Sequence, residues 1–239
     1  MRLQVGMTVA DRSPRTNYAR ATIDTLLAQV IQADHLHVFA SAPDVKWLGS
    51  DEGLTLHVPR RSLTRNENGL ALLRGVPPCD WVLHLEDDVV FCDDFLGSVA
   101  RWLARYACDR KVYTFCVMRG HPEAGCEAWD QPQNAWGCMA VAMRWRHVQE
   151  LADWVEQRLP GWREGQSNGW RKSGFDMMLR QWAGEPFLAS NPSFAQHIGR
   201  ESLTHAFRNR PFIKSPFFVG PDWSYRRADA KTELGSTSA

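Results

Sequence analysis

Strand-like and helix-like segments alternate along the first 107 residues of this 239-residue chain, and that alternation restricts its fold more than any other feature. Short apolar runs rich in β-branched residues predict strands at 3–10, 35–40, 54–59 and 81–87. Apolar residues spaced three and four apart predict helices at 15–33, 68–76 and 93–107. Such alternation is typical of α/β proteins. We therefore expect a Rossmann-like single domain with a mostly parallel central sheet flanked by helices.

The second half of the chain is less regular. Strands are predicted at 111–118, 137–143 and the start of 186–199, and helices at 144–159 and 175–183. Residues 119–135, rich in Pro, Gly and acids, read as a loop. Because ligands of open α/β sheets bind beyond the carboxyl ends of the strands, polar residues that directly follow a strand are the first candidates for a site.

Composition narrows the classes of protein that this chain can be. A formal net charge of +1 gives no bulk field for a nucleic acid or an anionic membrane. No apolar run approaches the ~18 residues of a membrane span, and the start "MRLQVGMTVADR" turns polar too soon for a signal peptide. We expect a soluble cytoplasmic protein. The six cysteines lack zinc-ligand spacing, which favours buried free thiols.

Three acids, Glu86, Asp87 and Asp88, interrupt the apolar stretch "WVLHLEDDVVF" (81–91) at the predicted end of a strand. Adjacent carboxylates repel, at a cost on the order of 4 kcal/mol at contact distance. A hard divalent cation such as Mg²⁺ or Mn²⁺ removes that cost, and it commonly takes one or two protein carboxylates together with substrate phosphates. The triplet taken alone fits a metal half-site and an ordinary solvated turn equally well.

An acid-x-acid element after an apolar strand resembles the DxD signature of GT-A glycosyltransferases. Two further segments, "TRNENGLALLRG" (64–75) and "SGFDMML" (173–179), resemble the donor-side helix and the catalytic-carboxylate helix of that fold. The segment "NPSFAQHIGRESL" (191–203) resembles a block of the N-acetylglucosaminyltransferase IV family, which branches N-glycans. The resemblance spreads over roughly residues 3–203 and implies a GT-A-type fold.

The resemblance implies a role for each block. Asp88 and His197 would bind the metal, Mn²⁺ or Mg²⁺, and Asp176 would be the general base that takes a proton from the acceptor. The acceptor or donor-sugar side would include Trp136 and Gly137. The nucleotide sugar, a UDP-sugar by preference, would be bound by Thr8, Arg12, Arg65, Asn66, Glu86 and Asp87.

The resulting expectation is a metal-dependent, inverting hexosyl- or N-acetylhexosaminyl-transferase. Residues 1–225 would form the glycosyltransferase domain, with a nucleotide-binding half (1–107), an acceptor-side half (108–225) and a flexible tail (226–239).

Three alternatives on partner and function stay open. The acceptor would be a glycan, a small molecule or a modified nucleic-acid base. The last is suggested by the segment 199–231, which is basic and aromatic. A metal-dependent nucleotidyltransferase or phosphohydrolase would use the same carboxylates. A non-catalytic sugar- or polyanion-binding module is the third reading.

Overall fold

The computed structural model describes residues 1–10, 18–29, 36–45, 52–117, 126–131, 139–163, 174–199, 215 and 217–223. The elements are β1 (Leu3–Val9), α1 (Ala19–Leu27), β2 (Leu36–Ala40), β3 (Leu54–His57), α2 (Arg65–Gly75), β4 (Trp81–Glu86), β5 (Val89–Phe91), α3 (Phe95–Tyr106), β6 (Tyr113–Thr114), β7 (Ala128–Gln131), β8 (Ala140–Arg144), α4 (Trp145–Arg163), α5 (Phe175–Ala183), β9 (Phe187–Ser190) and β10 (Ala195–His197).

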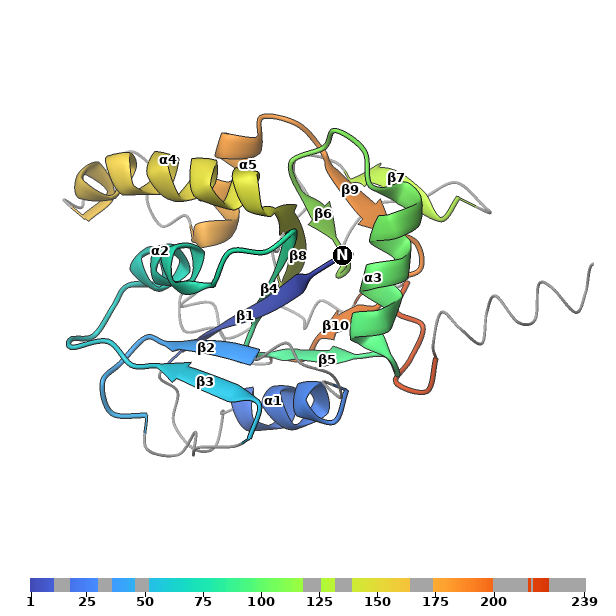
Figure 1. Ribbon diagram of the computed structural model, residues 1–239, viewed down its shortest axis with the longest axis horizontal. Helices are drawn as coiled ribbons and strands as arrows, with labels where there is room; N and C mark the ends of the chain where they lie inside the picture. The colour runs from blue at the N-terminus through green and yellow to red at the C-terminus, as the bar shows by residue number, and fades with distance from the viewer. Residues whose placement is uncertain are drawn as a thin grey trace, which may run out of the picture.

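An eight-stranded sheet, in the order β3-β2-β1-β4-β8-β6-β9-β7, forms the centre of the molecule (Figure 1). The strands β3, β2, β1 and β4 are parallel neighbours, whereas β8 and β7 pair antiparallel with the strands beside them. The predicted α/β fold with a mostly parallel central sheet and flanking helices is therefore confirmed. The carboxyl ends of β1 and β4 lie side by side, since Thr8 is in register with Glu86.

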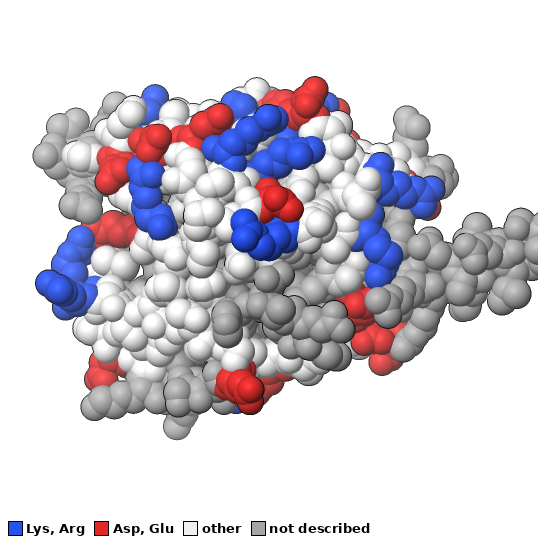
Figure 2. Space-filling model, in the orientation of Figure 1, with Lys and Arg blue, Asp and Glu red and all other residues white. Residues whose placement is uncertain are grey.

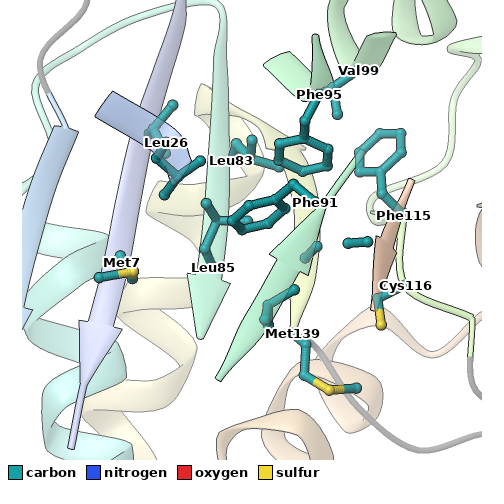
Figure 3. Packing of buried hydrophobic residues seen from close by; sticks show 14 of the residues in the cluster. Met7, Leu26, Leu83, Leu85, Phe91, Phe95, Val99, Phe115, Cys116 and Met139 are labelled. Atoms are coloured by element: carbon teal, nitrogen blue, oxygen red, sulfur yellow. The ribbon is translucent and has the colours of Figure 1, made fainter. Parts of the chain in front are cut away.

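Each face of the sheet packs against its own set of helices. One buried cluster joins Met7, Leu83 and Leu85 to side chains of α1 and α3, including Leu26, Phe95 and Val99 (Figure 3). The other joins Val82 and Met143 to side chains of α2, α4 and α5, including Leu72, Val155 and Leu179. In Figure 1, α2, α4 and α5 accordingly lie together, apart from α1 and α3. Continuous apolar burial on both faces is what parallel strands require.

The stretch 81–91, for which the sequence predicts a single strand at 81–87, contains two strands. β4 ends at Glu86, and β5 leaves the main sheet to pair antiparallel with β10 in a separate two-stranded ribbon. Asp87 and Asp88 are the two residues between β4 and β5. The acids therefore mark the point where the chain changes sheets.

Two other sequence predictions were wrong in detail. Residues 128–131, predicted as loop, form the edge strand β7 on β9. The helix predicted at 68–76 begins at Arg65, because Thr64 and Glu67 form a capping box at its start. Arg61 extends this cap through an ion pair of 2.8 Å with Glu67.

Charges of both signs are interspersed on the described surface. Figure 2 shows Lys and Arg next to Asp and Glu over much of the face drawn. Arg74 pairs with both Asp153 and Glu156 at 2.6 Å, so it contributes no isolated positive charge. Among the described residues, no helix combines the length and the apolar character needed to cross a membrane.

Candidate active site

Asp88 and His197 meet across the small ribbon. Val89 and His197 are partners in the β5–β10 register, and the Ile198 amide donates to the Asp88 carbonyl at 2.8 Å. The Oδ2 atom of Asp88 lies 3.3 Å from Nε2 of His197, although the two residues are 109 positions apart. The side chains are 8% and 22% exposed. The structure thus brings together the two residues to which the resemblance assigns the metal, and their role as ligands stays a prediction.

This pair fits one octahedral cation. With bonds of about 2.1 Å, adjacent ligands of an octahedral ion stand about 3 Å apart, close to the 3.3 Å between the two side chains. A direct hydrogen bond between imidazole and carboxylate fits the same distance. The described residues contain no group of three or more His, Cys, Asp or Glu arranged to hold a metal. A cation held by this pair would therefore need further oxygen ligands from a substrate or water.

Gly199 keeps the space beside the pair open. A Cβ atom at this position would lie 2.3 Å from Oδ2 of Asp88 and 2.8 Å from Nε2 of His197. Real Cβ atoms do not approach other atoms so closely, so any other residue would have to displace the pair. A glycine is thus required for steric reasons at the last position of "QHIG", which the sequence alone does not show.

Negative charge accumulates around Glu86, the last residue of β4. Burial, and then the neighbouring Asp88 carboxylate, raises the pKa of Glu86 to about 7, with Asp176 and Asp87 adding to the shift. The Arg65 guanidinium acts in the opposite direction. Glu86 therefore lies within electrostatic reach of three other described carboxylates as well as of Arg65, and a nearby cation would relieve the repulsion between carboxylates.

The Asp87 side chain is hydrogen-bonded to the chain directly after β1. Its Oδ2 atom accepts the Ala10 amide at 2.9 Å, and the side chain is almost fully buried. The hydroxyl of Thr22, on α1, donates to the carbonyls of Asp87 and Val89 at 3.0 and 2.9 Å. Asp87 thus holds β1, β5 and α1 together at the site, and its predicted nucleotide contact stays a prediction.

The first turns of α2 and α5 converge on this cluster. A Cβ at Gly174, the residue that precedes α5, would lie 2.2 Å from Nη1 of Arg65 and 2.9 Å from Oδ1 of Asp176. Arg65 therefore passes directly along the start of α5, next to the predicted base. Asn66 follows Arg65 in the first turn of α2, and no described residue bonds to its buried Oδ1 atom. Helix N-termini favour negative ligands, and this end of α2 also carries the Arg65 guanidinium and the Asn66 amide.

His84 lies beneath the site in the middle of β4. Its Nε2 atom is 3.3 Å from the Thr8 hydroxyl, and its ring meets the Phe175 ring edge-on at 5.2 Å between centroids. The side chain is 1% exposed, and burial lowers the pKa of His84 to about 4. The alternation of residues in this strand suggests a packed histidine, and the structure confirms that His84 is buried.

Acid is expected to destabilise the fold through His84. Between pH 6.5 and about 4 the ring is protonated in the unfolded chain and neutral in the folded chain. Stability therefore rises with pH across that window, by roughly 3 kcal/mol in total. Urea midpoints measured from pH 4 to 7 should fall more steeply with acidification for the wild type than for His84→Gln. Parallel curves would remove His84 as the cause.

The "NPSFAQHIG" block also has a structural role. The Ser193 hydroxyl accepts the Val117 amide at 2.9 Å, and the Gln196 Oε1 atom accepts the Ser215 amide at 3.1 Å. These bonds fix β10 between the strand-end segment 115–117 and the chain near residue 215. Cys116 lies in this layer beside the His197 backbone, and burial raises the pKa of its thiol to about 12. Its closeness to the acids was not foreseen, because cysteine spacing carries no information on this contact.

Three predicted site residues lie outside the described part of the chain. They are Arg12, Trp136 and Gly137. Their proposed contacts with the nucleotide, the acceptor or the donor sugar stay predictions. Most of the basic segment 199–231, on which the nucleic-acid alternative depended, is likewise not described.

Comparisons with known proteins give a remote match. No family model matches the chain, and no curated protein does. Among solved structures, it is similar to a mutant β-1,4-galactosyltransferase 7 from Drosophila, determined in complex with manganese, UDP-Gal and xylobiose. The identity is 11%, the TM-score is 0.41, and the match covers 94% of this chain and 79% of that one. A likeness of this size says nothing by itself about what the present chain binds, and it does not single out the N-glycan-branching family.

Proposed function

We propose that this chain is a metal-dependent glycosyltransferase with a GT-A-type fold, which moves a sugar from a nucleotide diphosphate sugar to an acceptor hydroxyl. The observation that carries the proposal is the approach of Asp88 to His197 at 3.3 Å, next to Glu86, at the carboxyl end of a central parallel strand. A metal half-site in this place leaves coordination positions for a diphosphate. A UDP-sugar is the favoured donor.

Several of these residues would bind the nucleotide sugar donor. Asp88 and His197 would hold Mn²⁺ or Mg²⁺, whose positive charge offsets the negative charge of a departing diphosphate. Arg65 and the first amides of α2 face the same anion, and Arg65 suits phosphate oxygens through its planar fork. Glu86 would meet the ribose or support the metal ligands.

Asp176 is proposed as the general base. It stands in the first turn of α5, within electrostatic reach of Glu86 and beside Arg65. It takes the proton of the acceptor hydroxyl as the new bond forms on the face of the anomeric carbon opposite the leaving nucleotide. The product therefore has inverted configuration. No covalent intermediate is needed.

The acceptor is proposed as a glycan or a small molecule. Residues 108–225 would supply that side, and residues 1–107 the nucleotide side. On the face drawn in Figure 2 the described charges are of both signs, and Arg74 and Arg110 are paired with acids, so these residues do not favour a nucleic-acid acceptor.

A panel of nucleotide sugars tests the proposed function. Thermal unfolding measured with each sugar nucleotide, with and without Mn²⁺, should show a rise in Tm for at least one UDP-sugar in the presence of the metal only. EDTA should cancel the rise. If no nucleotide sugar binds, or if binding ignores the metal, the proposal fails. Release of phosphate or pyrophosphate without a sugar acceptor would instead establish the nucleotidyltransferase or phosphohydrolase alternative.

A further inference from the structure

The ring of Phe175, the residue directly before Asp176, is held between two elements of the donor side. A Cβ at Gly69, within α2, would lie 2.4, 2.7 and 2.9 Å from three atoms of this ring. From β4, His84 meets the same ring edge-on at 5.2 Å. Phe175 is 2% exposed. The ring is therefore fixed by direct contact with α2 and by an edge-on ring contact with His84 of β4.

The same face of α2 touches α5 at two points. Arg65 and Gly69 are four residues apart in one helix, which places them on one side of it. Arg65 lies against Gly174, whose other close neighbour is Asp176, and Gly69 lies against Phe175. These contacts set the start of α5 against the start of α2; they lie one turn apart on α2 and at the adjacent residues Gly174 and Phe175 at the start of α5.

We propose that Gly69 and Phe175 are positioning residues that set Asp176 at its working distance from the donor site. The inference rests on the proposed function, since it takes Asp176 as the base. Neither residue touches the substrate. The Phe175 ring contacts both β4, which carries Glu86, and α2, which carries Arg65. It therefore fixes the position of the proposed base relative to the groups proposed to hold the nucleotide. Errors of about an ångström in such a placement reduce rates strongly while leaving binding intact.

The test uses Gly69→Ala, which adds one methyl group against the Phe175 ring. Alanine favours helix, so α2 itself should not be weakened. We expect kcat to fall at least tenfold while the donor Kd in Mn²⁺ changes less than threefold. Hydrogen exchange of the α5 amides at 176–179 should quicken, and exchange in α4 should not.

A second substitution separates steric displacement from a general loss of packing. Phe175→Leu in the Gly69→Ala background removes ring atoms from the crowded position and should restore most of the lost kcat and the slow exchange. The matched control is Phe187→Leu in the same background. Phe187 is 1% exposed in the same cluster, but it begins β9, next to the edge strand β7, where its ring faces Arg180 near the end of α5 and not Gly69. It should restore neither.

Each outcome decides the inference. Unchanged kcat and exchange in Gly69→Ala, or equal rescue by Phe187→Leu, would overturn it. A parallel loss of donor binding and kcat would also overturn it, because it would show a general distortion of the site. If the wild type transfers no sugar, the proposed function fails. The exchange measurements then still decide whether Gly69 and Phe175 set the start of α5.

Discussion

Asp88→Asn is expected to weaken donor binding in the presence of Mn²⁺ at least 100-fold, a loss of ~2.7 kcal/mol. The substitution keeps the shape of the side chain and removes the charge that a divalent cation needs. Binding of UDP-sugar measured by calorimetry with and without Mn²⁺ gives the result directly. Without metal, wild type and variant should bind the donor equally weakly.

The apo protein should tolerate this change. Asp88 raises the pKa of the neighbouring Glu86, which shows that their charges oppose each other in the folded chain. Removing one charge therefore relieves repulsion, and the Tm without ligands should not fall. Asp80→Asn is the matched control. Asp80 lies at the other end of β4, directly before the strand, and its side chain is 59% exposed. Full metal-dependent binding by Asp88→Asn would exclude Asp88 as a ligand.

Asp176→Asn is expected to reduce the rate of sugar transfer by on the order of 10³ while leaving donor binding in place. General-base catalysis typically contributes 10²- to 10⁴-fold, and an amide cannot accept the proton of the acceptor hydroxyl. Single-turnover measurements with saturating UDP-sugar and Mn²⁺ separate the transfer step from binding and product release. The loss should therefore be one of rate and not of affinity.

An exposed acid on a neighbouring helix provides the control. Asp153, on α4, has a side chain that is 63% exposed and paired with Arg74, so Asp153→Asn should transfer at the wild-type rate. Transfer within threefold of wild type by Asp176→Asn would remove Asp176 from the base role. The role of Asp88 would be untouched by that result.

The local pattern of the chain was enough to predict the parallel half of the sheet. β1, β2 and β4 lie where short apolar runs placed them, and α5 has the predicted bounds Phe175–Ala183. These elements are determined by residues close in sequence, and their burial on both faces produces the continuous apolar runs that reveal parallel strands. The proximity of Asp88 to His197 was foreseen only through the resemblance of short motifs.

Features that depend on distant contacts escaped prediction. β7 is a short edge strand whose pairing with β9 joins residues about sixty positions apart, and its four residues carry no alternation strong enough to stand out from a loop. Gly69, Gly174 and Gly199 read as ordinary glycines in sequence. Their importance is visible only where another segment comes within van der Waals distance of the missing Cβ.

The ribbon of β5 and β10 has a consequence for the order in which the site forms during synthesis. The strands β3, β2, β1 and β4 are complete once residue 86 has left the ribosome, but Asp88 meets His197 only 109 residues later. Contacts this distant in sequence carry a high entropic cost of loop closure and form late. A nascent chain can therefore pair these four strands before it can bring Asp88 to His197, and any product shortened before residue 197 lacks the pair.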